Sequence, residues 1–282
     1  MSSSVPYFDY VYAWYGRLGN NIISLANAIA YAQDNKHRLR FRDHEFLRQP
    51  KDREWNFGDN EFDLRHDHFF FDSLPDMPFR RYDICQEYIA PLLPLHEKLD
   101  SSDIGLLIPV RGEDVFNWPP HPNYVQCPFE YIQYVVGLEQ PKKITLLAQD
   151  MRNPIVSKIL DSYDVNFVLS PDISTVLSYY FSAESLVQTG ITSFVTSLIH
   201  CSSSLKRVYL PIFEVSPGNE KFFCDPCNVV IHTRFPDRVK ATWIRHSNFI
   251  TLGNWGKIPL DYSYDIKNLS IYNELELLRQ VV

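Results

Sequence analysis

The sequence predicts an α/β protein of two lobes, the second of which holds a parallel, doubly wound sheet. Short β-branched runs alternate with helix-like stretches after residue 104, and a strand–helix–strand pattern occupies the first forty residues. A polar, charged stretch at residues 97–103 separates the two regions. Strands that alternate with helices form parallel sheets. Ligands bind such sheets at the carboxyl ends of the strands, so we expect a cleft between the lobes.

The first lobe, residues 1–100, begins with a β-α-β unit. Residues 8–15 alternate aromatic and small side chains, which is typical of a strand. After a turn at 16–21, the apolar spacing predicts a helix over 22–33, and residues 38–41 form the next expected strand. Residues 43–100 contain five prolines and many charges, so they predict loops and short elements around an open face.

The second lobe, residues 101–282, carries the regular alternation. Its expected strands are short apolar runs at 104–110, 144–148, 165–169, 186–188, 208–212 and 229–231. Its expected helices are at 129–136, 154–160, 173–181 and 193–200. Residues 270–280 predict an amphipathic helix with Leu275 and Leu278 on its apolar side.

Composition excludes several classes of protein. Hydrophobic residues make up 45% of the 282 residues, and the formal net charge is −7, which disfavours binding to nucleic acid. No apolar run is long enough to span a membrane and no apolar leader begins the chain, so we expect a soluble, cytoplasmic protein. Cys224 and Cys227 form an isolated CxxC, and the pair His66 and His68 has no evident third ligand. We therefore predict no metal site and no cofactor.

The strongest motif is the turn from Gly16 to Asn21, which follows a strand and opens a helix. The helix amino end can bind an anion, and Arg17 adds a positive charge. The segment lacks the third glycine of a dinucleotide fingerprint and the Gly-Lys-Ser/Thr of a P-loop. A tight turn that only caps the helix is the alternative.

Two further strand ends carry similar signals. Arg111 and Gly112 follow the strand at 104–110 and precede Asp114, so Arg111 could hold a diphosphate or merely form a surface pair with Asp114. Thr189 and Gly190 follow another strand, and Thr192 and Ser193 begin the next helix, where they can cap it or bind a phosphate oxygen. Three strand-end anion sites in an acidic chain indicate a nucleoside diphosphate ligand.

These segments resemble the motifs of a known superfamily. Gly16-Arg17-Leu18-Gly19-Asn20 resembles the Gly-Arg-Phe/Leu-Gly-Asn-Gln opening of the fucosyltransferase superfamily, which covers α1,2-, α1,6- and protein O-fucosyltransferases. Val110 to Asp114 is similar to its His-x-Arg-x-x-Asp motif, and Thr189 to Phe194 to its late donor motif. The segment from His121 to Pro128 is similar to glycosyltransferase-like chains of algae and large algal viruses.

The resemblance implies a GT-B fold with two Rossmann-like lobes and an inverting, metal-independent sugar transfer. The donor would be a nucleotide sugar (GDP-fucose, or a UDP-sugar such as UDP-xylose) and the acceptor a glycan hydroxyl. A chain of this kind from a large algal virus could equally be a xylosyltransferase. The first lobe would form the acceptor side and carry the glycine-rich donor loop, and residues 101–282 would bind the nucleotide sugar.

The resemblance also implies roles for individual residues. Arg17 and Arg111 would act on the leaving diphosphate. The remaining donor-binding residues would be Gly16, Gly19, Asn20, Asp114, Thr189, Gly190, Thr192 and Ser193. Pro109 stands where the superfamily motif has its His, and Asn21 where it has Gln, which leaves the donor base and sugar open.

The acidic residues of the chain also bear on the chemistry. The chain contains no Asp-x-Asp, so the usual carboxylate pair for a metal-bound diphosphate is missing. An inverting transfer needs a general base, and the candidates are His44, Asp67, Asp76, Glu113, Asp114 and, favoured among them, Asp72 and Glu45. The alternative function is a non-catalytic α/β protein that binds a sugar or nucleotide. An NAD-linked oxidoreductase is disfavoured by the incomplete glycine fingerprint.

Overall fold

The computed structural model describes residues 9–11, 14, 16–58, 65–66, 77–94, 97–112, 125–190, 192–213, 238–246, 250–251 and 270–272. The chain divides into two compact units. Unit 1 comprises residues 1–95 together with Ser193–Cys201, and unit 2 comprises His96–Thr192 together with Ser202–Val282. The helix at Ser193–Cys201, which the sequence placed in the second lobe, is thus grouped with the first unit.

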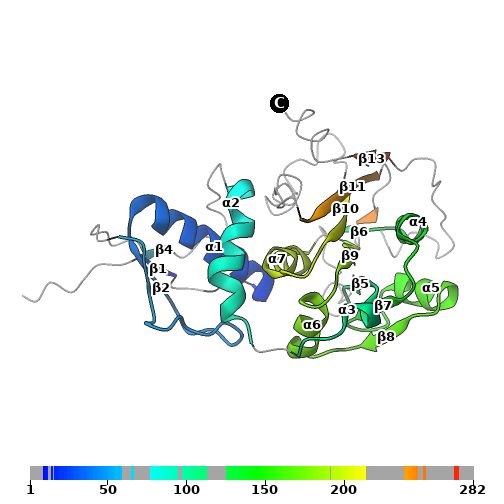
Figure 1. Cartoon of the computed structure of the whole chain (residues 1–282), viewed down its shortest axis with the longest axis horizontal. Coiled ribbons are helices and arrows are strands. Elements are labelled where there is room, and N and C mark those ends of the chain that lie inside the picture. The colour runs from blue at the N-terminus through cyan, green and yellow to red at the C-terminus, as the bar shows by residue number, and fades with distance from the viewer. Residues whose placement is uncertain are drawn as a thin grey trace, which may run out of the picture. The chain divides into compact units, whose positions relative to one another are not determined.

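Unit 2 is built on a seven-stranded sheet (Figure 1). Its strands are β5 (Leu106–Val110), β7 (Ile144–Ala148), β8 (Asn166–Leu169), β9 (Ser185–Val187), β10 (Arg207–Phe213), β11 (Lys240–His246) and β13 (Ser270–Tyr272). Their spatial order is β8-β7-β5-β9-β10-β11-β13, in which the first six are parallel and β13 is antiparallel to β11. Two short strands, β6 (Val125–Gln126) and β12 (Ile250–Thr251), pair separately.

The order of the six parallel strands is that of a Rossmann-like sheet. Numbered along the chain from β5, they lie in the order 3-2-1-4-5-6. Successive strands are therefore added on one side of β5 up to β8 and on its other side from β9 onward, which makes the position between β5 and β9 a topological switch point. Such a topological switch point leaves a crevice at the carboxyl ends of the two strands, where ligands bind in open α/β sheets. The prediction of an α/β fold with a parallel, helix-flanked sheet is confirmed.

The core of unit 2 forms because its central strands are apolar on both faces. All five residues of β5 and of β7 are buried, as expected for a parallel sheet covered on both sides. One face packs against α4 (Phe129–Glu139) and α5 (Pro154–Ser162) through Ile108, Leu146 and Val187. The register places Leu107, Leu147 and Leu186, all buried, on the opposite face.

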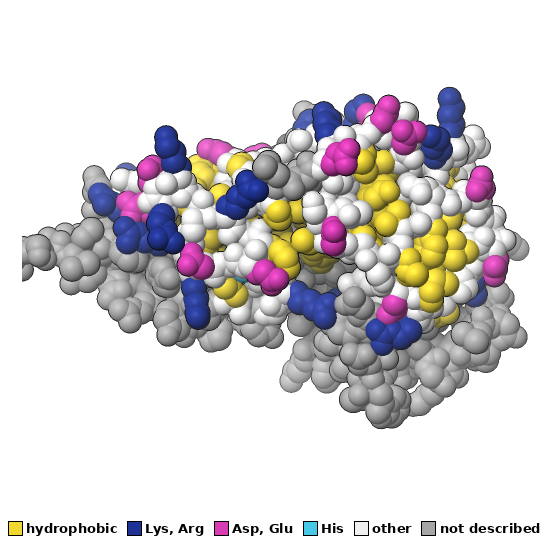
Figure 2. All heavy atoms as spheres, turned by 90° about the horizontal axis from the view of Figure 1, so that it is seen from below, with side chains coloured by type: hydrophobic (Ala, Val, Ile, Leu, Met, Phe, Trp, Pro, Cys, Tyr) yellow, Lys and Arg dark blue, Asp and Glu magenta, His cyan; other side chains and the backbone are white. Residues whose placement is uncertain are grey.

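Three helices of unit 2, α3 (Ser101–Ile104), α5 and α6 (Ile173–Tyr180), begin at residues whose side chains cap them. Asn153 accepts a hydrogen bond from the Ile155 N–H at the start of α5, and Asp172 accepts one from Thr175 at the start of α6. The short α3 is capped by Asp100 through Ser102. Figure 2 shows apolar side chains among charged ones on the surface, and Leu138, Met151 and Leu169 are the exposed large apolar residues of the described chain.

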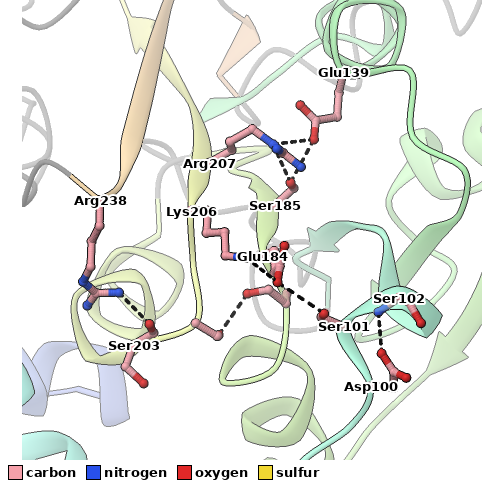
Figure 3. Close-up of polar contacts among 12 residues, drawn as sticks. Asp100, Ser101, Ser102, Glu139, Glu184, Ser185, Ser203, Lys206, Arg207 and Arg238 are labelled. Atoms are coloured by element: carbon pink, nitrogen blue, oxygen red, sulfur yellow. Dashed lines mark hydrogen bonds and ion pairs between the residues drawn. The ribbon is translucent and has the colours of Figure 1, made fainter.

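A polar network joins the amino ends of β9 and β10 to the end of α4 (Figure 3). The Glu139 carboxylate accepts hydrogen bonds from Ser185 at 2.9 Å and from the Tyr209 hydroxyl, and it pairs with Arg207 at 2.7 Å. Burial raises the pKa of Tyr209, and the hydrogen bond to Glu139 raises it further. This network lies at the amino ends of the strands, whereas the switch point lies at their carboxyl ends. The network therefore stabilises the fold and is not part of a site at the switch point.

Unit 1 contains a smaller sheet and a layer of helices. Its strands are β1 (Asp9–Val11), β2 (Arg38–Phe41), β3 (Trp55–Asn56) and β4 (Arg65–His66), in the order β3-β2-β1-β4. Strand β1 is parallel to β2 and β4, and α1 (Leu18–Asn35) connects β1 to β2. The predicted β-α-β unit is therefore confirmed.

The structure differs from the expected elements at several positions. Residues 77–92 form one helical run, consisting of α2 (Met77–Ile84), a π-helix (Cys85–Ile89) and a 3-10 turn (Ala90–Leu92), where the sequence predicted loops and short elements. Residues 270–272 are a strand, so the helix predicted over 270–280 does not begin there. β11 was not predicted, and the strand expected at 229–231 lies outside the described residues.

The helices of unit 1 enclose a cationic side chain. Arg81 of α2 is only 1% exposed, and its Nη2 donates a hydrogen bond to Asn27 Oδ1 of α1 at 3.3 Å. Its Nε and Nη1 atoms have no hydrogen-bond partner in the described structure. Burial lowers the pKa of Arg81 to about 10. His200, in α7 (Ser193–Cys201), lies close enough that the Arg81 charge adds to burial in lowering the pKa of His200 to about 3.

Among the described helices, none combines the length and the apolar character needed to cross a lipid bilayer.

Buried His200 makes the stability of unit 1 depend on pH. Its folded pKa of about 3 lies below the value of 6.5 for an exposed histidine, so the unfolded chain takes up a proton first as pH falls. The buried imidazole should lower the free energy of unfolding by about 1.4 kcal/mol for each pH unit below pH 6.5, which amounts to about 2 kcal/mol at pH 5. Urea unfolding across this range should give a shallower pH dependence for His200→Gln than for the wild type. An equal dependence of the free energy of unfolding on pH in the two proteins would contradict the conclusion that His200 is buried and uncharged.

Candidate functional site

The amino end of α1 is arranged to receive an anion. Gly16 has φ +69°, a left-handed conformation that turns the chain into the helix. Arg17 occupies the N-cap without capping through its side chain, and no acidic residue lies in the first turn of α1. Arg17 is exposed. A helix amino end carries a partial positive charge and N–H groups directed outward, which together favour a negative ligand.

A second helix amino end lies against the first. A Cβ atom added to Gly19 would lie 2.4 Å from the Phe194 backbone nitrogen, so only glycine allows α1 and α7 to approach this closely. The Ser193 hydroxyl donates a hydrogen bond to Asn20 Oδ1, and the Ser197 hydroxyl donates one to the Gly19 carbonyl at 2.9 Å. Gly19 and Asn20 of the first motif therefore meet the last two residues of the third motif, Ser193 and Phe194, within unit 1.

Helices α1 and α7 run in the same direction. Gly19 contacts the start of α7, while Asn27, two turns further along α1, lies with His200 beside Arg81. The positive ends of the two helix dipoles thus coincide. The first turn of α7 also lacks acidic residues. Two coincident amino ends attract an anion more strongly than one, because the partial charges act at the same place.

His44 supports this arrangement from the loop after β2. Its Nδ1 accepts hydrogen bonds from the N–H groups of Phe46 at 2.9 Å and Leu47 at 3.2 Å, so the proton is on Nε2. Nε2 lies 2.8 Å from the side-chain amide of Asn21. In the flipped amide orientation, Oδ1 of Asn21 accepts that proton, which satisfies an oxygen otherwise buried without a partner.

These contacts give His44 a positioning role. Burial lowers the pKa of His44, and the charge of Glu45 opposes that effect to a smaller extent. The Trp14 ring meets the His44 ring edge-to-face at 4.9 Å. With one nitrogen accepting backbone hydrogen bonds and the other directed at Asn21, the imidazole fixes the first turn of α1. The sequence named His44 only as a candidate base.

In unit 2, the second motif lies at the topological switch point. Arg111 and Gly112 follow β5 directly, and Gln188 to Gly190 follow β9. The Thr189 hydroxyl donates a hydrogen bond to the Pro109 carbonyl at 2.6 Å, which joins the two strand ends. Gln188 is only 3% exposed and its Oε1 has no hydrogen-bond partner in the described structure. The predicted placement of Arg111 at the carboxyl end of a strand is confirmed.

The loop after β7 holds the end of β5 in place. Gln149 Oε1 accepts a hydrogen bond from the Gly112 N–H at 2.9 Å, and Asn153 Nδ2 donates one to the Arg111 carbonyl at 3.0 Å. A Cβ atom on Gly112 would lie 2.3 Å from Asp150 Oδ1. The sequence reading missed Gln149, Asp150 and Asn153, although a polar run directly after a buried strand marks this position.

The remaining predicted residues fall in different places. Glu45 is exposed, next to His44 in the loop after β2, and Gly190 and Thr192 are buried in unit 2. Asp72 and Asp114 lie outside the described residues, as do the candidate bases Asp67, Asp76 and Glu113. Among the described residues, no three His, Cys, Asp or Glu side chains form a group that could hold a metal ion. Cys224, Cys227 and His68 are outside that set.

Replacement of Gly19 by alanine should separate the two helix amino ends. The added methyl group would meet the α7 backbone, so we expect Gly19→Ala to lower the free energy of unfolding by about 1–3 kcal/mol. The matched control is Gly137→Ala in α4, where an added Cβ meets no atom within 4 Å. That change should be neutral or stabilise the protein by about 0.5–1 kcal/mol. Denaturant titration measures both, and equal effects would contradict the close approach.

Comparison with known proteins yields no match: no protein-family model, no curated protein and no solved structure is significantly similar to this chain.

Proposed function

We propose that the chain is a nucleotide-sugar-dependent glycosyltransferase of GT-B type that transfers a sugar with inversion to a glycan hydroxyl. The observation that carries the proposal is the contact between the amino ends of α1 and α7. It brings together two motifs that resemble the donor-binding segments of fucosyltransferases, and it creates a positive end beside Arg17 that suits a diphosphate.

Unit 2 supports the same proposal independently. A Rossmann-like sheet with an arginine at its switch point is a suitable nucleotide-binding unit, because the guanidinium can hold two phosphate oxygens at once. The strand end lacks the Gly-x-Gly-x-x-Gly that a dinucleotide fold places after its first strand. A nucleoside diphosphate therefore fits better than NAD.

The chemistry follows from where negative charge develops. When the bond between the sugar and the diphosphate breaks, charge accumulates on the leaving oxygen, and a fixed cation stabilises that state more than the ground state. Arg111, at the switch point of unit 2, is proposed to supply this stabilisation. A carboxylate, Asp72 or Glu45, would take the proton of the acceptor hydroxyl as its oxygen attacks the anomeric carbon from the opposite side.

Truncation of Arg111 should slow turnover. By analogy with loss of one oxyanion donor, we expect Arg111→Ala to reduce kcat by roughly 10²–10³-fold, and Arg17→Ala to act in the same direction. Arg111→Lys should recover only part of the activity, because a point charge does not reproduce the bidentate fork. Donor turnover with GDP-fucose and UDP-xylose, assayed by nucleotide release, measures these effects.

The control for these variants is Arg238→Ala. Arg238 is exposed and lies just before the amino end of β11, whereas the switch point lies at the carboxyl ends of the strands. Its loss should therefore leave kcat unchanged. Near wild-type turnover in a folded Arg111→Ala protein would rule out the switch point as the donor site. Binding of a nucleoside diphosphate by the wild type without any turnover would support the alternative of a non-catalytic binding protein.

Activity should survive chelation. The chain has no Asp-x-Asp to hold a metal-bound diphosphate, and the proposed cationic groups would take that place. We expect an excess of EDTA to change the rate of donor turnover by less than about twofold, the effect expected when no metal assists the leaving group. A loss of turnover in EDTA that Mn²⁺ restores would overturn the metal-independent mechanism.

A further inference from the structure

Asp150 occupies a distinctive place in unit 2. It follows β7, the strand next to β5 on the side away from the switch point, and its carboxylate lies against the end of β5. The absence of a side chain on Gly112 makes this possible, because an added Cβ would lie 2.3 Å from Asp150 Oδ1 and 2.7 Å from its carboxyl carbon. The carboxylate is thus placed one residue beyond Arg111.

The surrounding contacts hold this carboxylate in a defined orientation. Asp150 Oδ1 accepts a hydrogen bond from the Arg152 N–H at 2.9 Å, and Oδ2 accepts one from Arg152 Nε at 2.5 Å. The Asp150 side chain remains 23% exposed. Arg152 thus orients a carboxylate that reaches solvent, and the oxygens of a carboxylate are strong hydrogen-bond acceptors.

We propose that Asp150 accepts hydrogen bonds from the ribose hydroxyls of the bound nucleotide and makes the site selective for ribonucleotides over 2′-deoxynucleotides. This inference rests on the proposed function. With the diphosphate at Arg111, the ribose comes next along the ligand, and β7 is the neighbouring strand. A vicinal diol offers two O–H donors to the two oxygens of one carboxylate, and hydrogen bonds to a charged group are stronger than neutral ones.

Gly112 and Arg152 then have defined tasks. Gly112 lets the carboxylate approach the strand end that carries Arg111, so that phosphate and ribose contacts belong to one ligand. Arg152, whose side chain is 47% exposed, fixes the rotamer of Asp150 before the ligand arrives. No carboxylate of the described segments directly after β5 or β9 competes for this role, since those segments consist of Arg111, Gly112 and Gln188 to Gly190.

The test is calorimetric titration of the full chain with GDP, 2′-deoxy-GDP, UDP and 2′-deoxy-UDP. We expect the wild type to bind the better ribonucleotide at least about tenfold more tightly than its 2′-deoxy analogue, the scale of one hydrogen bond to a charged group. Asp150→Asn should weaken binding of the ribonucleotide most. It should weaken binding of the 2′-deoxy analogue, which keeps its 3′-hydroxyl, to a smaller extent, so that the two affinities become nearly equal.

Two further variants complete the experiment. Gly112→Ala should cause the same loss of discrimination, because its methyl group displaces the carboxylate. The matched control is Asp161→Asn, an exposed aspartate near the end of α5, which should leave both affinities unchanged. Thermal unfolding of each variant shows whether it is folded. The comparison of ribonucleotide and 2′-deoxynucleotide binding by the wild type tests the proposal even if a variant fails to fold.

The outcomes separate this inference from the proposed function. Equal affinity of the wild type for ribo- and deoxynucleotides would overturn the role of Asp150 and leave the nucleotide site standing. Discrimination that persists in folded Asp150→Asn would also overturn it. Absence of binding by all four nucleotides would instead reject the proposed function, and this inference with it.

Discussion

The close contact between the amino ends of α1 and α7 is the interaction on which the candidate site depends. Gly19 removes the side chain that would hold the helices apart, and the Ser193 and Ser197 hydroxyls then satisfy Asn20 and the Gly19 carbonyl. The parallel course of the two helices follows from a second contact region at Arg81. Because both dipoles end at the same place, the helix layer of unit 1 acquires a positive end without a cluster of basic side chains.

Unit 2 reaches a similar result by a different route. Its central strands are buried on both faces and almost wholly apolar, so most polar side chains lie where the strands end. At the carboxyl ends, Thr189, Gln149 and Asn153 bind backbone atoms of the β5 end or the residues just after it. The network around Glu139 performs the corresponding task at the amino ends. The sheet therefore presents Arg111 on a backbone that is held from both neighbouring strands.

The sequence predicted those parts of the fold that local patterns determine. The apolar strands and the glycine turns after them are local signals, which is why the three motif segments and Arg111 were placed at strand ends. The helical run at 77–92 was missed because Pro78 and Pro91 are read as breaks, whereas they lie near the start of α2 and within the 3-10 turn. β11 (Lys240–His246) was missed because polar residues interrupt its apolar ones. The roles of Asn21, His44 and Asp150 depend on contacts between segments distant in sequence, which no local pattern contains.

The grouping of α7 with unit 1 also affects how the chain can fold during synthesis. Helix α7 is the connection between β9 and β10 of the unit 2 sheet, yet its packing partners are α1, α2 and the π-helix of unit 1. The hydrogen bond between Asn20 and Ser193 closes a loop of 173 residues. During synthesis, residues 1–95 therefore leave the ribosome before α7, the helix that packs against Gly19. Four strands of the unit 2 sheet, β5, β7, β8 and β9, are synthesised before α7. Loop closure over such a separation is slow, so the amino-terminal unit is completed late although it is made first.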